Sequence, residues 1–192
     1  MGLQAIYPKP NTSAASRQEH KVYPYLLNDV CVYYPNQVWC SDITYIRMKH
    51  GHIYLVAIMD WYSRYVIDWE LSITLEAEFC VDTLRRSLKT SACGIFNTDQ
   101  GSQYTSKSWI NTLLENNVLI SMDGKGRCFD NIFIERLWRS VKYECIFLRE
   151  FDSVAEVKQA WLYRNKCTTL KPLLPLVYTG IYHNLLYPEI YV

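Results

Sequence analysis

The sequence predicts a single α/β domain, built on one mixed β-sheet with helices on its faces. Its 192 residues are enough for one domain with a substantial core and too few for two. Hydrophobic residues make up 49% of the chain, which indicates a globular rather than a disordered protein. Three strand-like segments come first and strands then alternate with helices, an order typical of a mixed sheet covered by helices.

Five segments have the composition of strands, with many β-branched, aromatic and aliphatic residues. They are residues 36–48, 53–61, 63–72, 94–99 and 118–122. The second is a nearly continuous apolar run, which is typical of a strand buried on both faces. The His50-Gly51 pair predicts a turn before it, and a tight turn after it leads into an antiparallel third strand.

Four segments have helical patterns, so the predicted order is β-β-β-α-β-α-β-α-α. They are residues 74–90, 105–117, a long segment from the loop 123–131 to about Arg149, and a last one to about Arg164. Thr74, a Thr or Ser at the start of the second segment, and Asp152 or Ser153 are expected to cap them. In the long helix an apolar stripe has helical spacing. It consists of Ile134, Leu137, Trp138, Val141, Cys145 and Leu148.

Composition excludes several classes of protein. The net charge of +1 does not indicate a nucleic-acid binder, so DNA binding would require locally clustered Lys and Arg. The seven cysteines are odd in number and lack C-x-x-C spacing, which predicts reduced thiols in a cytosolic protein and no zinc site. The apolar segment 172–188 is too short for a membrane span and contains three prolines.

Three acidic residues occupy positions that packing alone would not favour. Asp42 lies inside the first strand, Asp99 ends the fourth, and Glu135 lies in the first turns of the long helix. The first and fourth strands are neighbours in a sheet of this order, so Asp42 and Asp99 are expected to lie close together. Close carboxylates repel unless a proton or a metal lies between them, and hard oxygen ligands suit Mg²⁺ or Mn²⁺. A structural role remains the alternative for each acid, since Asp60 and Asp68 also lie in apolar strands.

The helix around Glu135 also has a polar face, formed by Asn131, Glu135, Arg139 and Lys142. Cations beside an acid fit a substrate that carries phosphate. The alternative is a solvated face on which Glu135 and Arg139 form an i, i+4 ion pair.

Four segments resemble the catalytic core of DDE transposases. They are "NQVWCSDITYI", "VAIMDWYSRYVIDW", "FNTDQGSQYTS" and "SMDGKGRCFDNIFIERLWRSVKYE". The resemblance is narrower to bacterial insertion-sequence transposases encoded in two reading frames, whose core is related to retroviral integrase. The 35 residues between Asp99 and Glu135 match the usual spacing of that family. The resemblance covers roughly residues 1–160.

This resemblance implies a ribonuclease-H-like fold and DNA transposition by phosphodiester hydrolysis and strand transfer. Asp42, Asp99 and Glu135 would be the catalytic acids and would hold two Mg²⁺ or Mn²⁺ ions. The partners would be DNA, both transposon ends and target, and either further copies of this chain or a full-length transposase. The expected location is the bacterial cytoplasm, in association with the nucleoid.

Further residues match family positions that are expected to contact DNA or to orient ligands. Side chains and backbone N–H groups of this kind position phosphates without reading sequence. The candidates are Gly101, Ser102, Gln103, Lys125, Arg127, Asn131, Arg139 and Lys142. Asp60 also matches a recurrent family aspartate, and we expect a structural role for it.

Both ends depart from the family pattern. Residues 1–35 are expected to form a linker or arm, without the helix-turn-helix region that precedes the core in relatives. Residues 36–164 are the expected core, and residues 165–192 a divergent tail that reads like a shifted frame. These departures indicate that the chain is encoded by a truncated gene copy. The alternative function is therefore that of an inactive remnant, which binds DNA or full-length transposase. A cellular ribonuclease-H-type nuclease shares the fold, but the Asp-Asn…Glu-Arg pattern disfavours it.

Overall fold

The computed structural model describes residues 21–124 and 132–169. Within these residues no helix has the length and apolar character needed to cross a membrane. The cysteines that the structure describes are free thiols, in agreement with the prediction for them. They are Cys31, Cys40, Cys80, Cys93 and Cys145.

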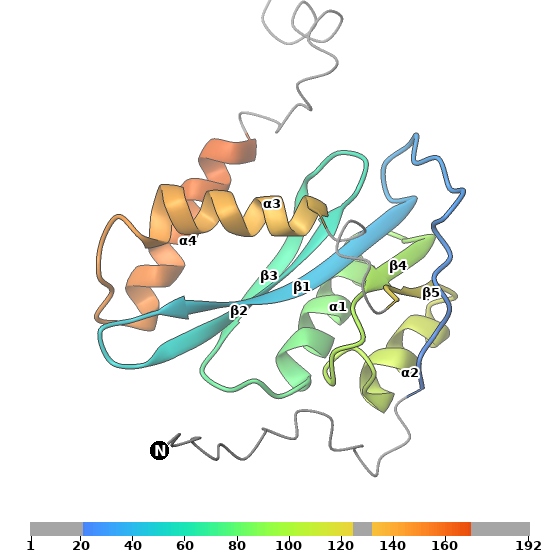
Figure 1. The fold of residues 1–192 in the computed structure, drawn as a ribbon, viewed down its shortest axis with the longest axis horizontal. Coiled ribbons are helices and arrows are strands. Elements are labelled where there is room, and N and C mark those ends of the chain that lie inside the picture. The colour runs from blue at the N-terminus through green and yellow to red at the C-terminus, as the bar shows by residue number, and fades with distance from the viewer. Residues whose placement is uncertain (1–20, 125–131, 170–192) are drawn as a thin grey trace, which may run out of the picture.

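One mixed sheet of five strands forms the centre of the protein (Figure 1). Its strands are β1 (Val38–Arg47), β2 (His52–Asp60), β3 (Val66–Ser72), β4 (Ile95–Thr98) and β5 (Leu119–Met122). Their order across the sheet is β3-β2-β1-β4-β5. The first three strands pair antiparallel, whereas β4 pairs parallel with both β1 and β5. The predicted mixed sheet is confirmed, and so is the predicted contact between the first and fourth strands.

Helices cover both faces of this sheet, as Figure 1 shows. They are α1 (Glu78–Thr90), α2 (Lys107–Glu115), α3 (Ile132–Val141), a π-helical turn η2 (Lys142–Ile146) and α4 (Val154–Thr169). Helices α1 and α2 pack on one face around Trp109 and Phe96, and α3 and α4 pack on the other around Trp138 and Trp161. The predicted order of strands and helices is therefore confirmed.

The alternation of β1 aims its side chains at the two helical layers in turn. Trp39 and Ile43 join the core beneath α1 and α2, whereas Cys40 and Ile46 join the core beneath α3 and α4. Asp42 lies between Cys40 and Ile46 on the second of these faces. The acid is therefore carried toward α3 by the period of the strand.

Strand β1 loses its partner on one side where the candidate site begins. It pairs with β2 along Trp39–Arg47, but with β4 only at Val38–Cys40. From Ser41 onward the described residues contain no further partner on the β4 side. Asp42 is the second residue of this free edge.

Helix caps agree with the prediction in two places and differ in one. Ser106 accepts a hydrogen bond from Trp109 N, and Ser153 accepts one from Glu156 N. Thr74 was expected to cap the first helix, and this is wrong. Helix α1 begins after Ala77 without a side-chain cap, because Thr74 is still bonded through its backbone N to Ser72 Oγ at the end of β3.

The predicted apolar stripe of the long helix is correct up to Cys145 and wrong at Leu148. Leu148 is 73% exposed, and Ile146 is buried in its place. The turn η2 inserts the extra residue of an i→i+5 hydrogen bond, from Phe147 N to Lys142 O. A 3.6-residue period cannot anticipate this change of phase.

Candidate active site

Asp42 is held in place by the long helix. The indole Nε1 of Trp138 donates a hydrogen bond to Oδ2 of Asp42 over 2.8 Å. Asp42 is half-buried, while Trp138 is buried in the core beneath α3. One carboxylate oxygen of Asp42 is therefore oriented by a rigid donor, on the strand edge that β4 leaves open.

Asp99 follows β4 directly, and the loop after it is shaped around its carboxylate. Gly101 N donates to Asp99 Oδ1 over 2.9 Å. A β-carbon on Gly101 would lie 2.9 Å from the same oxygen, so a residue with a side chain cannot occupy this position without a shift. The loop is fastened to β1 by the buried hydrogen bond between Tyr104 OH and Ser41 Oγ, 3.1 Å long. Ser41 immediately precedes Asp42, so this bond joins the two acidic segments.

Glu135 lies on the exposed side of α3, one turn before Trp138. The buried residues Ile134, Leu137 and Trp138 surround it in sequence and fix the rotation of the helix. Among the described residues no ion pair joins Glu135 to Arg139. The pair expected of a purely solvated face is therefore missing.

The first turn of α3 is fastened by an aromatic and cationic cluster from the turn between β2 and β3. The Trp61 ring packs edge-on against Phe133, with centroids 5.5 Å apart, and the Arg64 guanidinium lies over the face of the same ring. Phe133 is two residues before Glu135. Burial lowers the pKa of Arg64 to about 10, opposed by the nearby Cys40 and Asp60, and the group remains a cation at neutral pH.

The pKa of Asp42 is affected by both of the other candidate acids. Burial raises the pKa of Asp42 above its ordinary value, and the hydrogen bonds from Trp138 and from the Ile43 backbone oppose this effect. The negative charges of Asp99 and Glu135 raise the pKa further. Like charges have this effect on one another when they lie near each other.

The donor set fits a hard divalent cation in its chemistry. All three acids offer carboxylate oxygens, and Mg²⁺ binds through one or two carboxylates per ion, with water and phosphate oxygens completing the shell. Within the residues that the structure describes, no group of three acidic, His or Cys side chains is close enough to hold an ion unaided. The three acids therefore do not form a closed cage for an ion in this structure.

The loop residues expected to contact DNA have structural partners here. Gln103 donates from Nε2 to Leu75 O over 2.9 Å, and Ser102 donates to Gln103 Oε1 over 3.2 Å. Gly101 supports Asp99 as described. Three further candidates, Lys125, Arg127 and Asn131, lie outside the described residues.

Arg139 and Lys142 continue the α3 surface beyond Glu135. Arg139 is exposed and lines a hollow of about 230 Å³ together with Arg136, Ser140, Tyr143 and Glu144. Lys142 places its Nζ 5.0 Å from the centre of the Tyr45 ring on β1. Arg139 thus lies in α3 after Glu135, and Lys142 lies at the start of η2.

Asp60 has the structural role that was expected. It is 2% exposed and accepts hydrogen bonds from the backbone N of Asn36 and of Ser63. Sequence reasoning missed one residue that contacts a candidate acid and one that packs on the first turn of α3. Trp138 was assigned to the apolar stripe alone, although an indole N–H one turn after an acid is itself a signal for a polar partner. Arg64 was not singled out, and nothing local in the sequence indicates its contact with Phe133.

Comparisons with known proteins identify similar chains. The integrase core domain model matches residues 33–128, which is half of the chain. Transposase InsF for insertion sequence IS3A, from Escherichia coli strain K12, is 39% identical over 122 residues, 62% of this chain and 42% of that relative. The transposase for insertion sequence element IS904, from Lactococcus lactis subsp. lactis strain IL1403, is 34% identical over 177 residues, 83% of this chain and 66% of the relative. The chain thus spans less than half the length of InsF.

A solved structure has the same fold. A chain of the simian T-cell lymphotropic virus intasome in complex with PP2A regulatory subunit B56 gamma aligns with a TM-score of 0.52 at 18% identity. The alignment covers 74% of this chain and 44% of that chain. This likeness confirms the predicted fold class.

Proposed function

The chain belongs to the integrase core domain family, and from this membership we propose that it is the catalytic core of an insertion-sequence transposase. Its reaction is divalent-metal-dependent hydrolysis of a phosphodiester and transfer of the freed DNA strand to a target. The observation that supports the proposal is how the acid-bearing segments are joined: Trp138, one turn after Glu135, bonds Asp42, and the Tyr104–Ser41 bond joins the Asp99 loop to β1. The core is assigned to residues 36–164, the partners are transposon ends and target DNA, and the reaction takes place at the bacterial nucleoid.

Each acid has a distinct means of positioning in this proposal. Trp138 orients Asp42, the backbone of Gly101 orients Asp99, and the packed stripe of α3 orients Glu135. Together they would hold two Mg²⁺ or Mn²⁺ ions. Bound there, such ions supply Lewis-acid polarisation of the phosphodiester and a lowered pKa for the attacking hydroxyl.

The protein's own contribution is to preorganise negative charge. Burial first, and then the charges of Asp99 and Glu135, raise the pKa of Asp42, so its charged form is disfavoured in the free protein. Cations relieve this repulsion, so binding of ions and DNA stabilises the charged site. The attacking group is water in the first step and a DNA 3′-hydroxyl in the second.

The test is strand cleavage and joining by the purified chain on duplex DNA with Mg²⁺ or Mn²⁺. Glu135→Gln keeps the shape of the side chain and is expected to abolish both reactions. Glu150→Gln makes the same change at an exposed acid after η2 and should leave them intact. Activity that survives Glu135→Gln would refute the assigned mechanism. A wild-type chain that binds DNA without cutting it would favour the inactive remnant instead.

A further inference from the structure

One face of the β1–β2 hairpin is polar and aromatic while the other is core. Tyr45 pairs across the strands with Tyr54, and Arg47 pairs with His52, so these four side chains share a face. We call them the hairpin surface. On the opposite face Ile46 and Ile53 are buried beneath α3 and α4. Burial of Ile46 and Ile53 explains why the hairpin packs on the core. It does not explain why aromatic residues lie on the other face.

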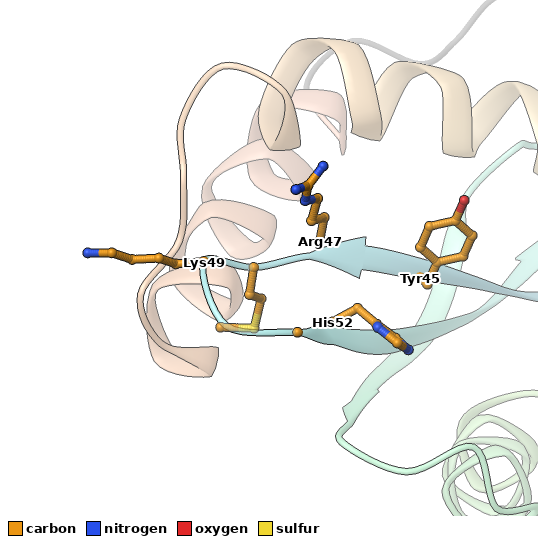
Figure 2. Close-up of a pocket in the computed structure, with 6 residues that line it drawn as sticks. Tyr45, Arg47, Lys49 and His52 are labelled. Carbon is orange, nitrogen blue, oxygen red and sulfur yellow. The ribbon is translucent and has the colours of Figure 1, made fainter.

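The hairpin surface is a continuous cluster rather than four separate residues. The His52 ring lies edge-on to Tyr45 and to Tyr54, with centroids 6.3 Å and 5.3 Å away, and its Nε2 is 3.1 Å from Tyr54 OH. Tyr45 is 64% exposed despite its size. Figure 2 shows Tyr45 and Arg47 projecting from the same side of β1. Residues 45–52 line a hollow of about 520 Å³, formed by Tyr45, Arg47, Met48, Lys49, Gly51 and His52.

The charge at this surface is positive and available. Within the described part of the chain Arg47 makes no ion pair and no side-chain hydrogen bond. Lys49 pairs with Asp152 over 3.0 Å, so its charge is partly balanced. An unpaired guanidinium beside one exposed and one partly buried tyrosine ring is chemistry suited to a sugar-phosphate backbone.

Asp42 and the hairpin surface lie on opposite faces of β1, and the free edge of the strand joins them. Trp138 contacts Asp42, and four residues later Lys142 contacts Tyr45, three residues after Asp42 on β1. Helix α3 and strand β1 therefore run in the same direction from the site to the hairpin. Lys142 reaches Tyr45 at the edge of β1 that β4 leaves free.

The length of this path matches DNA. At about 3.3 Å per strand residue, Arg47 lies roughly 17 Å along β1 from Asp42. That distance equals about five base pairs, at roughly 3.4 Å of duplex axis for each. A duplex whose scissile phosphodiester is held at Asp42 and which runs along the free edge of β1, where side chains of both faces can be reached, would meet Arg47 about half a helical turn away.

We propose that the hairpin surface binds the sugar-phosphate backbone of duplex DNA on one side of the bond held at the acids. Arg47 supplies the cation, and Tyr45 and Tyr54 supply packing surface and hydroxyl donors. The proposal rests on the proposed function for its ligand, and it adds a DNA site on an element outside the acidic triad.

Equilibrium binding to a fluorescent duplex of about 30 base pairs tests the proposal, measured by anisotropy over a series of salt concentrations. The chain carries Glu135→Gln so that the DNA stays intact. Arg47→Ala is expected to weaken binding roughly fivefold and to reduce the slope of log K against log salt by about 0.9. Arg47→Lys should keep the slope. Lys89→Ala is the control, because it removes the same charge from the last turn of α1. The strand that follows α1 pairs with the start of β1, at the end opposite to Arg47, so this variant should change neither the affinity nor the salt slope.

Photocrosslinking gives a second measurement that does not depend on a variant. The same duplex, with iododeoxyuridine distributed along both strands, is expected to crosslink to Tyr45 or Tyr54. Equal affinity and slope for Arg47→Ala and Lys89→Ala would overturn the proposal, as would an absence of DNA binding by the chain.

Strand joining is assayed separately, so that the hairpin surface and the proposed function can be told apart. If Arg47→Ala loses DNA binding but the wild type joins no strands, the hairpin surface is supported and the proposed function is refuted. If the wild type joins strands but DNA binding does not depend on Arg47, the proposed function is supported and the hairpin surface is refuted.

Discussion

Trp138 Nε1 lies 2.8 Å from Asp42 Oδ2, and this hydrogen bond joins the helix that carries one candidate acid to the strand that carries another. Trp138→Phe removes the donor and keeps most of the packing. Loss of one hydrogen bond to a charged group should cost about 1.5–3 kcal/mol. Part of this loss should reduce activity, because the Asp42 carboxylate is then no longer held in position. We expect strand cleavage to fall by roughly tenfold or more, since about 1.4 kcal/mol corresponds to a factor of ten.

A matched control exists on the other face of the sheet. Trp109 is also fully buried, and its Nε1 has no hydrogen-bond partner among the described residues. Trp109→Phe should lower the melting temperature without lowering the cleavage rate per folded molecule. Equal losses of activity in the two variants would show that the indole hydrogen bond has no special role.

Asp42→Asn is expected to stabilise the metal-free protein. Burial and the neighbouring acids raise the pKa of Asp42, so the folded state favours its protonated form more than the unfolded state does. Stability from this group is therefore present below the unfolded pKa and is lost as the pH rises through the folded pKa. Thermal melts from pH 3 to 8 should show the variant above the wild type at neutral pH. The two should converge below about pH 3.9, where the unfolded carboxyl is protonated.

Asp68→Asn is the control for this stabilisation. Asp68 accepts a hydrogen bond and ion pair from Arg86 Nε over 2.8 Å, so removing its charge should lower the melting temperature. Mg²⁺ should raise the melting temperature of the wild type and of Asp68→Asn, but not of Asp42→Asn. A stabilising effect of Mg²⁺ on all three would contradict the assignment of Asp42 as a ligand.

Arg64→Ala is expected to loosen the start of α3. The guanidinium covers the ring of Phe133, and such cation–π contacts are worth about 0.5–2 kcal/mol. Hydrogen exchange should become faster in the first turn of α3, and the Mg²⁺ concentration for half-maximal cleavage should rise. Arg64→Lys should recover only part of the effect, because an ammonium group cannot stack its plane on the ring. Unchanged exchange in α3 would count against this coupling.

Gly101→Ala is expected to displace Asp99. The added methyl group would meet Asp99 Oδ1 at 2.9 Å, and cleavage should fall by more than tenfold, or about 1.4 kcal/mol. Gly94→Ala is the control, because its methyl group would meet Gln37 O, also at 2.9 Å, away from the acids. Both variants should lose thermal stability, but only Gly101→Ala should lose activity per folded molecule. Loss of activity in both would point to general unfolding.

Sequence patterns were reliable where the position of a residue depends on a single strand or helix, or on the order of these elements. The helical stripe left Glu135 exposed, and the order of the elements made the first and fourth strands neighbours, as the structure confirms. They failed where two elements meet. The π-helical turn buries Ile146 rather than Leu148, and the end of β3 holds Thr74 away from α1.

The sequence by itself therefore determined the order of strands and helices, the family, and the chain positions of the acids. These depend on short-range periodicity and spacing. Tertiary structure alone decided that Trp138 orients Asp42, that Arg64 covers Phe133, and that Lys142 reaches Tyr45 at the free edge of β1. Each of these contacts joins residues far apart in the chain. Their formation depends on how the packed layers bring side chains together, which no local pattern records.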